Sequence, residues 1–166
     1  MNDLRNKPIV VGFDDHEASR KALLQAVELS AALQVHLHVV HVIGMRDTPI
    51  DPDSMDWEEE FDEHLKKLQQ HARQLITLPA DAWTYHAVDG DAWRQMLLLS
   101  EQVDAGMIVV GQHLHAHAVA SALGHLLGSR RKEFFSSSGK NSVSDHLLHH
   151  GGRSILIVTT ADEISS

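Results

Sequence analysis

The chain contains no cysteine among its 166 residues. Disulfides, thiolate metal sites and a cysteine nucleophile are therefore excluded. Aromatic residues make up only 5% of the chain, and no apolar run approaches the roughly 20 residues that a membrane helix needs. The first apolar run, residues 8–13, is also too short for the core of a signal peptide. We therefore expect a cytoplasmic protein that has no membrane partner.

The chain also lacks an excess of basic residues. Its 14 Lys and Arg residues stand against 23 acids, which gives a formal net charge of −9. Nine of these acids lie between Asp47 and Glu63, a stretch without Lys or Arg, and the rest of the chain is neutral. We expect this acidic segment to be solvated surface, because the ligand spacing of an EF-hand is missing. The sequence shows no basic face of the kind that binds nucleic acid, so we expect no nucleic-acid partner.

Short runs rich in Val, Ile and Leu alternate with patterns that have helical spacing. The predicted strands are residues 8–13, 35–43, 83–88, 106–110 and 154–160. Strands that alternate with helices indicate a parallel sheet with helices on both faces. We therefore predict a single, doubly wound α/β domain over residues 1–166. The segment 112–141 is too long for an ordinary connection after a strand, so it is either functional or an insertion.

In open parallel sheets, ligands bind beyond the carboxyl ends of the strands. Asp14 follows the first predicted strand, and Gly111, Gln112 and His113 follow the fourth. A carboxylate at one strand end and a glycine-led loop at another can hold a ribose or metal and a phosphate chain. The helix that begins near Ser142 would offer backbone N–H groups to phosphates. The glycine-rich motif of dinucleotide-binding proteins and a complete P-loop are both absent.

Several motifs, taken in order, resemble the universal stress protein family. They are the strand, aspartate and helix start at 9–19 (IVVGFDDHEAS), His41-Val42, the turn at 88–91 (VDGD), the strand at 107–111 (MIVVG), and the last helix and strand at 142–148 and 154–158. Each motif alone has little specificity, but the set covers most of the chain in the family's order.

The resemblance implies a five-stranded sheet of order 3-2-1-4-5 and a homodimer joined through the fifth strand, Ser154 to Thr160. It also implies a stress-response or regulatory protein that binds ATP or AMP, with Mg²⁺ as a companion of ATP and at most slow ATP hydrolysis. In the family the aspartate after the first strand lies by the nucleotide, and backbone after the second strand meets adenine. The residues that this carry-over and the strand-end rule select are Asp14, Val42, Gly111, Gln112, His113, Ser142, Val143 and Ser144.

The chain departs from the family's phosphate loop, whose pattern is Gly-x2-Gly-x9-Gly-Ser. Gly111 matches the first glycine, but Leu114 stands where the second belongs. Between Gly111 and Ser142 lie 30 residues, far more than the pattern contains. Two hypotheses follow. One is a nucleotide-binding regulatory protein. The other is a dimeric interaction protein that has lost nucleotide binding and whose His-rich loop serves a partner or a metal.

Histidine is abundant, with 14 residues. His113, His115 and His117 alternate and would point to one side of an extended segment, so they are weak candidates for a metal site together with His125. No carboxylate or cysteine in this segment completes the ligand set, which favours a solvated loop without metal. We expect His36 and His38, on the second predicted strand, to be packed or hydrogen-bonded under a helix rather than to be metal ligands.

Overall fold

The computed structural model describes residues 6–44, 56–114, 143–150 and 152–161. In these ranges nine elements follow one another: β1 (Ile9–Gly12), α1 (Glu17–Leu33), β2 (Leu37–Ile43), α2 (Trp57–Leu75), β3 (Trp83–Asp89), α3 (Ala92–Gln102), β4 (Met107–Leu114), α5 (Val143–His150) and β5 (Ser154–Ala161). None of the helices in the described ranges is long and apolar enough to cross a membrane.

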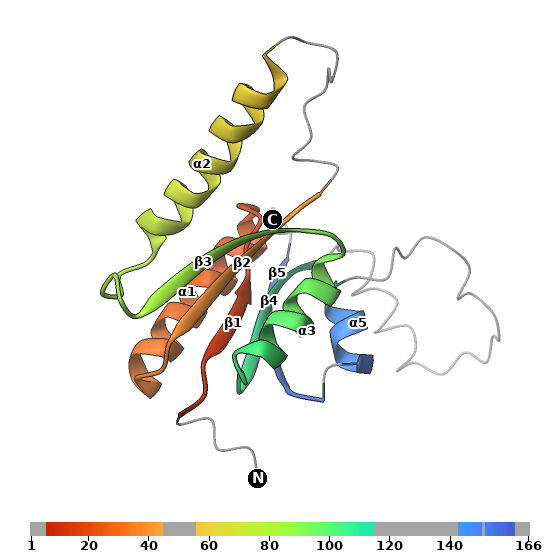
Figure 1. The fold of residues 1–166 in the computed structure, drawn as a ribbon. Coiled ribbons are helices and arrows are strands. Elements are labelled where there is room, and N and C mark those ends of the chain that lie inside the picture. Colours follow the sequence, from red (N-terminus) through yellow and green to blue (C-terminus); the bar gives the residue numbers. More distant parts are fainter. Residues whose placement is uncertain (1–5, 45–55, 115–142, 151, 162–166) are drawn as a thin grey trace, which may run out of the picture.

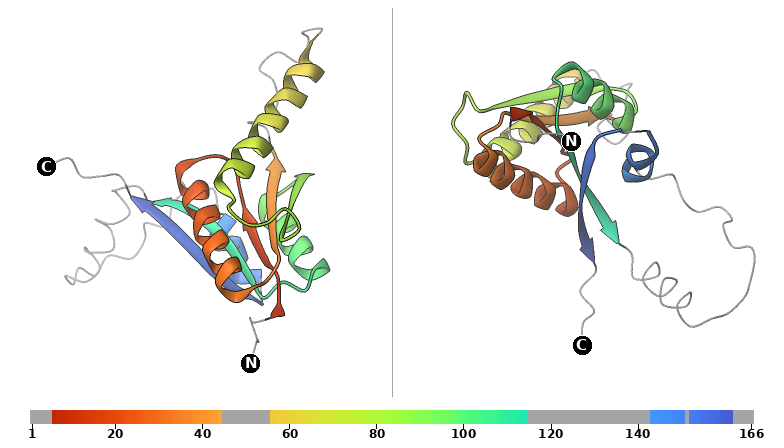
Figure 2. Two further views of the ribbon diagram at one scale, coloured as in Figure 1. Left: turned by 90° about the vertical axis from the view of Figure 1, so that its left-hand side faces the viewer. Right: turned by 90° about the horizontal axis from the view of Figure 1, so that it is seen from below.

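The five strands form one sheet of order β3-β2-β1-β4-β5, in which all neighbours are parallel. This arrangement confirms the predicted fold. Helices α1 and α2 cover one face of the sheet, and α3 and α5 cover the other (Figures 1 and 2). The chain winds outward from β1 to β3 and then returns to place β4 on the other side of β1. The strand order therefore reverses between β1 and β4.

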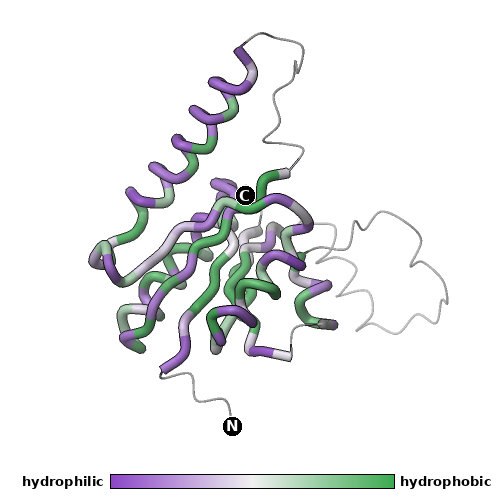
Figure 3. The backbone as a smooth tube through the Cα atoms, in the orientation of Figure 1, coloured by the Kyte–Doolittle hydropathy of each residue, from purple (hydrophilic) through white to green (hydrophobic). Residues whose placement is uncertain are grey.

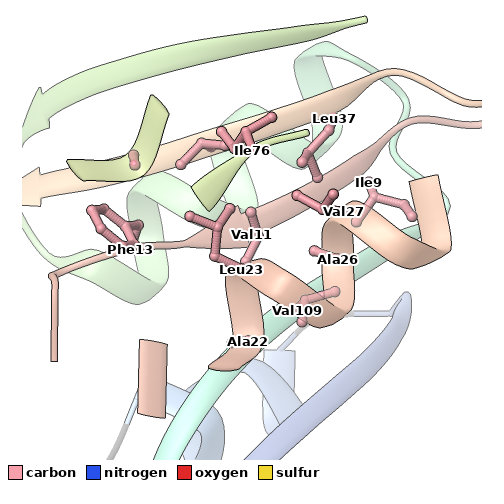
Figure 4. Close-up of a cluster of buried hydrophobic side chains, with 12 residues drawn as sticks. Ile9, Val11, Phe13, Ala22, Leu23, Ala26, Val27, Leu37, Ile76 and Val109 are labelled. Carbon is pink, nitrogen blue, oxygen red and sulfur yellow. The ribbon is translucent and has the colours of Figure 1, made fainter. Parts of the chain in front are cut away.

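Two apolar cores lie on the two faces of the sheet because neighbouring strand residues point to opposite sides. Val11 and Val109 pack with α1 and with Ile76, which follows α2, in the first core (Figure 4). Val10 and Ile108 pack with Met96 of α3 and Leu147 of α5 in the second core. The central strands are buried on both sides, which explains their continuous apolar sequences.

Among the described residues, helix α2 packs against the rest of the domain mainly through its second half. Leu68 and Ala72 are its buried residues, whereas the turns from Trp57 to His64 are largely exposed and rich in acids. Figure 1 shows these first turns projecting beyond the sheet, and Figure 3 shows their predominantly hydrophilic character. The described part of the acidic segment, residues 56–63, therefore lies on the surface, as predicted.

Strand β4 is longer than the sequence analysis predicts. It runs from Met107 to Leu114 and not from Gly106 to Val110, because β5 pairs with it as far as Leu114 opposite Ala161. Gln112 and His113 therefore belong to the sheet and not to a loop, and the prediction of a loop that begins at residue 112 is wrong. Residues 115–142, which include His115, His117, His125 and Ser142, lie outside the described part of the chain.

Candidate functional site

A cavity of about 180 Å³ opens at the carboxyl ends of β1, β2 and β4, where the strand order reverses. This is the position at which open parallel sheets bind ligands. Its walls are mainly apolar and come from the strands, the start of α1, α3 and α5, with one carboxylate at the rim. The lining residues are Gly12, Phe13, Asp14, Ser19, Val40, Val42, Ala92, Met96, Val110, Gly111 and Val143.

Four of the residues selected from the sequence line this cavity, namely Asp14, Val42, Gly111 and Val143. They come from four elements or turns that lie far apart in the chain. Parallel strands bring their carboxyl ends to one edge of the sheet, and α5 returns over the same edge. The fold thus collects these four residues around one hollow.

Asp14 is exposed at the rim, in the turn between β1 and α1. Its backbone N–H donates to Oγ of Ser19 at 3.2 Å, and its Oδ1 accepts the N–H of His16 at 3.1 Å. These bonds fix the carboxylate beside the start of α1. The carboxylate oxygens have further acceptor capacity, and they suit hydroxyl donors such as those of a ribose.

The next residue, Asp15, holds the turn in shape. Its backbone has a φ of +61°, which is uncommon for a residue with a side chain. Its Oδ2 lies 2.8 Å from Nδ1 of His71 on α2, and its Oδ1 lies 3.6 Å from Nε of Arg20 on α1. Asp15 thereby links α2 to the turn that carries Asp14, and its own side chain is committed to that link.

Val42 presents its backbone to the same hollow. In a parallel sheet, the peptide groups of every second residue face the same neighbouring strand. The carbonyl of Val40 accepts the N–H of Phe13 at 2.8 Å, so the Val42 groups also face the β1 side. Strand β1 ends at Gly12, opposite Val40. The N–H and C=O of Val42 therefore point into the space beyond the end of β1.

Gly111 has a packing role that the sequence analysis missed. A Cβ at this position would lie 2.6 Å from the backbone N of Ser19 and closer still to the carbonyl group of Ala18. The absence of a side chain thus lets β4 approach the first turn of α1. This contact brings the end of β4 and the Asp14 turn to the same side of the cavity.

Gln112 and Ser144 contact each other next to the cavity. The buried hydroxyl of Ser144 donates to Oε1 of Gln112 at 3.0 Å, which ties the first turn of α5 to β4. Neither residue is among those that line the cavity. His113 occupies β4 opposite Thr160. Gln112 and His113 lie in the sheet because β4 extends to Leu114.

The apolar walls include residues that the sequence analysis did not select. Val40 and Val110 lie on β2 and β4, while Ala92 and Met96 lie on α3. Ala92 and Met96 lie one helical turn apart on α3, and this apolar face continues from the core to the cavity. No local signal separates the wall positions from ordinary core positions, because both are apolar.

In the described ranges, no group of three or more His and acidic side chains is arranged to hold a metal ion. Of the weak candidates, His113 lies on β4, while His115 and His117 lie outside the described residues. The predicted metal-free loop therefore stays a prediction.

The chain matches the family model described as the universal stress protein family over residues 5–159. The chain belongs to the universal stress protein family. This result confirms the resemblance drawn from the motifs. Among curated proteins, none matches this chain.

Solved structures of universal stress proteins share this fold. A family member from Burkholderia pseudomallei is 19% identical, with 93% of this chain and 96% of that chain covered and a TM-score of 0.60. A universal stress protein in complex with cAMP is 18% identical, with 92% and 96% covered and a TM-score of 0.54. The protein from Archaeoglobus fulgidus in complex with dAMP is 15% identical, with 92% and 97% covered and a TM-score of 0.52.

Proposed function

We propose that this universal stress protein binds an adenine nucleotide in the cavity at the carboxyl ends of β1, β2 and β4, and that occupancy of this site regulates its role in the stress response. The observation that carries the proposal is the convergence of Asp14, the Val42 backbone and apolar walls on one hollow. The complexes of two related proteins with cAMP and dAMP support the choice of ligand.

Each part of the nucleotide has a suitable partner in the site. The flat adenine ring fits between apolar side chains such as Val40 and Met96, and its polar edge fits the backbone of Val42. The carboxylate of Asp14 accepts ribose hydroxyl groups. The first residue of α5, Val143, lies at the cavity wall, so the N–H groups at the start of this helix face a phosphate.

The proposal also concerns how many phosphates the bound nucleotide carries. One phosphate needs only the start of α5, whereas the outer phosphates of ATP and a Mg²⁺ ion require further ligands from the segment between Gly111 and Ser142. Leu114 replaces the second glycine of the family's phosphate loop, and β4 continues as a paired strand through this residue. We therefore expect AMP to bind about as tightly as ATP with Mg²⁺.

Calorimetric titration with AMP, cAMP, ATP with Mg²⁺ and GMP tests the proposal. We expect saturable binding of adenine nucleotides and an affinity about tenfold or more weaker in Asp14→Asn, because this change weakens a charge-assisted hydrogen bond. Asp62→Asn, on the exposed half of α2, is the matched control and should bind as the unmodified chain does. No saturable binding at millimolar nucleotide would refute the proposal.

One observation, the continuous strand through Leu114, favours a second function. In this alternative, the chain is a dimeric interaction protein that binds no nucleotide. Denaturation of the freshly purified protein separates the two functions, since a bound nucleotide is released and absorbs near 260 nm. Absence of a released nucleotide, together with a flat titration, would favour the interaction protein.

We propose further that two copies join through β5, which is an edge strand of the sheet. Ile155, Leu156, Ile157 and Val158 are each only partly buried in the single chain, so a second copy would cover more of their surface. Light scattering after gel filtration should show a dimer. Thr159→Lys on β5 should yield monomers, whereas Ala87→Lys on the opposite edge strand β3 should not; a monomeric unmodified chain would contradict the proposal.

A further inference from the structure

Three imidazole rings gather on one face of the sheet, and none of them lines the cavity described above. His36 precedes β2, His38 lies on β2, and His86 lies on β3. Figure 1 shows β2 and β3 side by side. His38 stands opposite Thr84, and His86 stands opposite Val40. Because side chains alternate between faces, these residues share the face that α3 covers over the centre of the sheet. All three histidines are only partly buried.

The rings are close enough to interact. Nδ1 of His38 lies 3.0 Å from Nε2 of His86, and the two ring centroids are 5.3 Å apart. The ring of His36 lies 4.7 Å from that of His38, but its Nε2 is bonded to Oγ1 of Thr84 at 2.9 Å. The cluster therefore contains one imidazole pair whose nitrogen atoms face each other and a third ring that is held by a hydroxyl.

The separation of the paired nitrogens matches a metal chelate. A divalent transition metal binds imidazole nitrogens at about 2.0–2.1 Å. Two such ligands at right angles lie about 2.9 Å apart, and two at the tetrahedral angle lie about 3.3 Å apart. The observed 3.0 Å is nearer to the right-angle value, which Cu²⁺ and Ni²⁺ favour. Little movement of the strands is needed, because the rings turn about their own side-chain bonds.

We propose that His38, through Nδ1, and His86, through Nε2, chelate one Cu²⁺ or Ni²⁺ ion on this face of the sheet, with water in the remaining positions. The ring that donates the present hydrogen bond moves its proton to its other nitrogen, so both imidazoles stay neutral when they bind. Burial lowers the pKa of both histidines, so protons compete little for these nitrogens at neutral pH. His36 stays on Thr84 and is not a ligand.

The site is independent of the proposed nucleotide cavity. On β2, the cavity residues Val40 and Val42 follow His38 toward the carboxyl end of the strand, on the same face of the sheet. His38 lies toward the amino end from them, and His86 stands beside Val40 on β3, but none of the three histidines lines the cavity. Metal binding therefore requires no nucleotide, and failure of one proposal leaves the other standing.

Nuclear magnetic resonance of ¹⁵N-labelled imidazoles tests the proposal in the full chain, because it resolves individual histidines. Titration with Ni²⁺ or Cu²⁺ at a small fraction of an equivalent should broaden the signals of His38 and His86 first. Zn²⁺, which is diamagnetic, should then shift Nδ1 of His38 and Nε2 of His86 and leave their other ring nitrogens protonated. Selective broadening elsewhere, or shifts at the opposite nitrogens, would overturn the assignment.

Two substitutions make the test specific. His86→Gln should lower the Ni²⁺ affinity of this site at least tenfold, whereas His36→Gln, the matched change on the neighbouring ring, should lower it less than threefold. His38→Asn should repeat the loss, so that the result does not depend on the folding of one variant; amide spectra establish that each variant keeps its fold. Equal losses in His36→Gln and His86→Gln, or no loss in either ligand variant, would refute the two-ligand chelate.

Discussion

The hydroxyl of Ser144 donates a hydrogen bond to Oε1 of Gln112 at 3.0 Å, and it joins two elements that border the proposed nucleotide site. Ser144 lies in the first turn of α5, and Gln112 lies on β4. The first residue of α5 is part of the cavity wall. The bond therefore helps to set where the start of α5 meets a ligand.

We expect Ser144→Ala to lower the free energy of unfolding by about 1 kcal/mol, because it removes a buried hydrogen bond between two elements. Ser100→Ala is the control, since in the described part of the chain the buried Ser100 hydroxyl bonds the Leu97 carbonyl of its own helix, and its loss should cost less. Urea denaturation measures both. An equal effect of the two changes would show that the α5–β4 bond has no special role.

Gly111→Ala should destabilise the protein by about 1–3 kcal/mol, because the new methyl group would overlap the backbone of Ala18 and Ser19. Backbone atoms cannot move aside as a flexible side chain can. Gly44→Ala, where no atom of the described residues other than its chain neighbours lies within 4 Å of the added Cβ, should change stability by no more than about 0.5 kcal/mol. Comparable urea midpoints for the two variants would contradict the packing role of Gly111.

Ala92→Phe should abolish nucleotide binding and leave the fold intact. Ala92 is the first residue of α3 and lines the cavity, so a phenyl group there fills the space that adenine needs. Leu98→Phe adds a similar ring to an exposed position of the same helix and should bind normally. Calorimetry and circular dichroism give the two readouts, and undiminished binding in folded Ala92→Phe would place the nucleotide elsewhere.

The stability of the metal-free protein should fall as the pH drops from about 6.5 toward 4. Burial, with smaller contributions from His36 and His86, lowers the pKa of His38 from 6.5 to about 4. In this pH window His38 binds a proton in the unfolded chain but not in the folded chain, so acid favours unfolding. Denaturation in the presence of a chelator should show a shallower pH slope for His38→Gln than for the unmodified chain. Equal slopes would contradict the lowered pKa.

The local sequence predicts the alternation of strands and helices well, because period and β-branched composition act within each element. Asp14 could be predicted because it stands at the end of a recognisable strand, whereas Val42 was selected through the resemblance to the family. The end of β4 could not be predicted from the local sequence, because Gln112 to Leu114 become strand only by pairing with Thr159 to Ala161 far along the chain. Such pairing leaves no signal in the segment itself.

The histidine pair shows the same limit. Alternation placed His36 and His38 on one face, and the prediction that they are hydrogen-bonded is confirmed. The register between β2 and β3 decides that His38 meets His86, and the sequence does not specify that register. Gly111 illustrates a second limit. A glycine in the sequence is compatible both with backbone that approaches a phosphate and with a strand that packs closely against a helix, and the sequence does not distinguish the two.

The central claim is that an adenine nucleotide occupies the cavity against Met96, and methyl resonances of ¹³C-labelled methionine test it most directly. Met96 lines the cavity, whereas Met107 packs against the core on the other face. Titration with AMP should shift the Met96 methyl signal in a saturable way, leave that of Met107 unchanged, and have no effect in Ala92→Phe. An unmoved Met96 signal at millimolar AMP, cAMP and ATP with Mg²⁺ would contradict the claim.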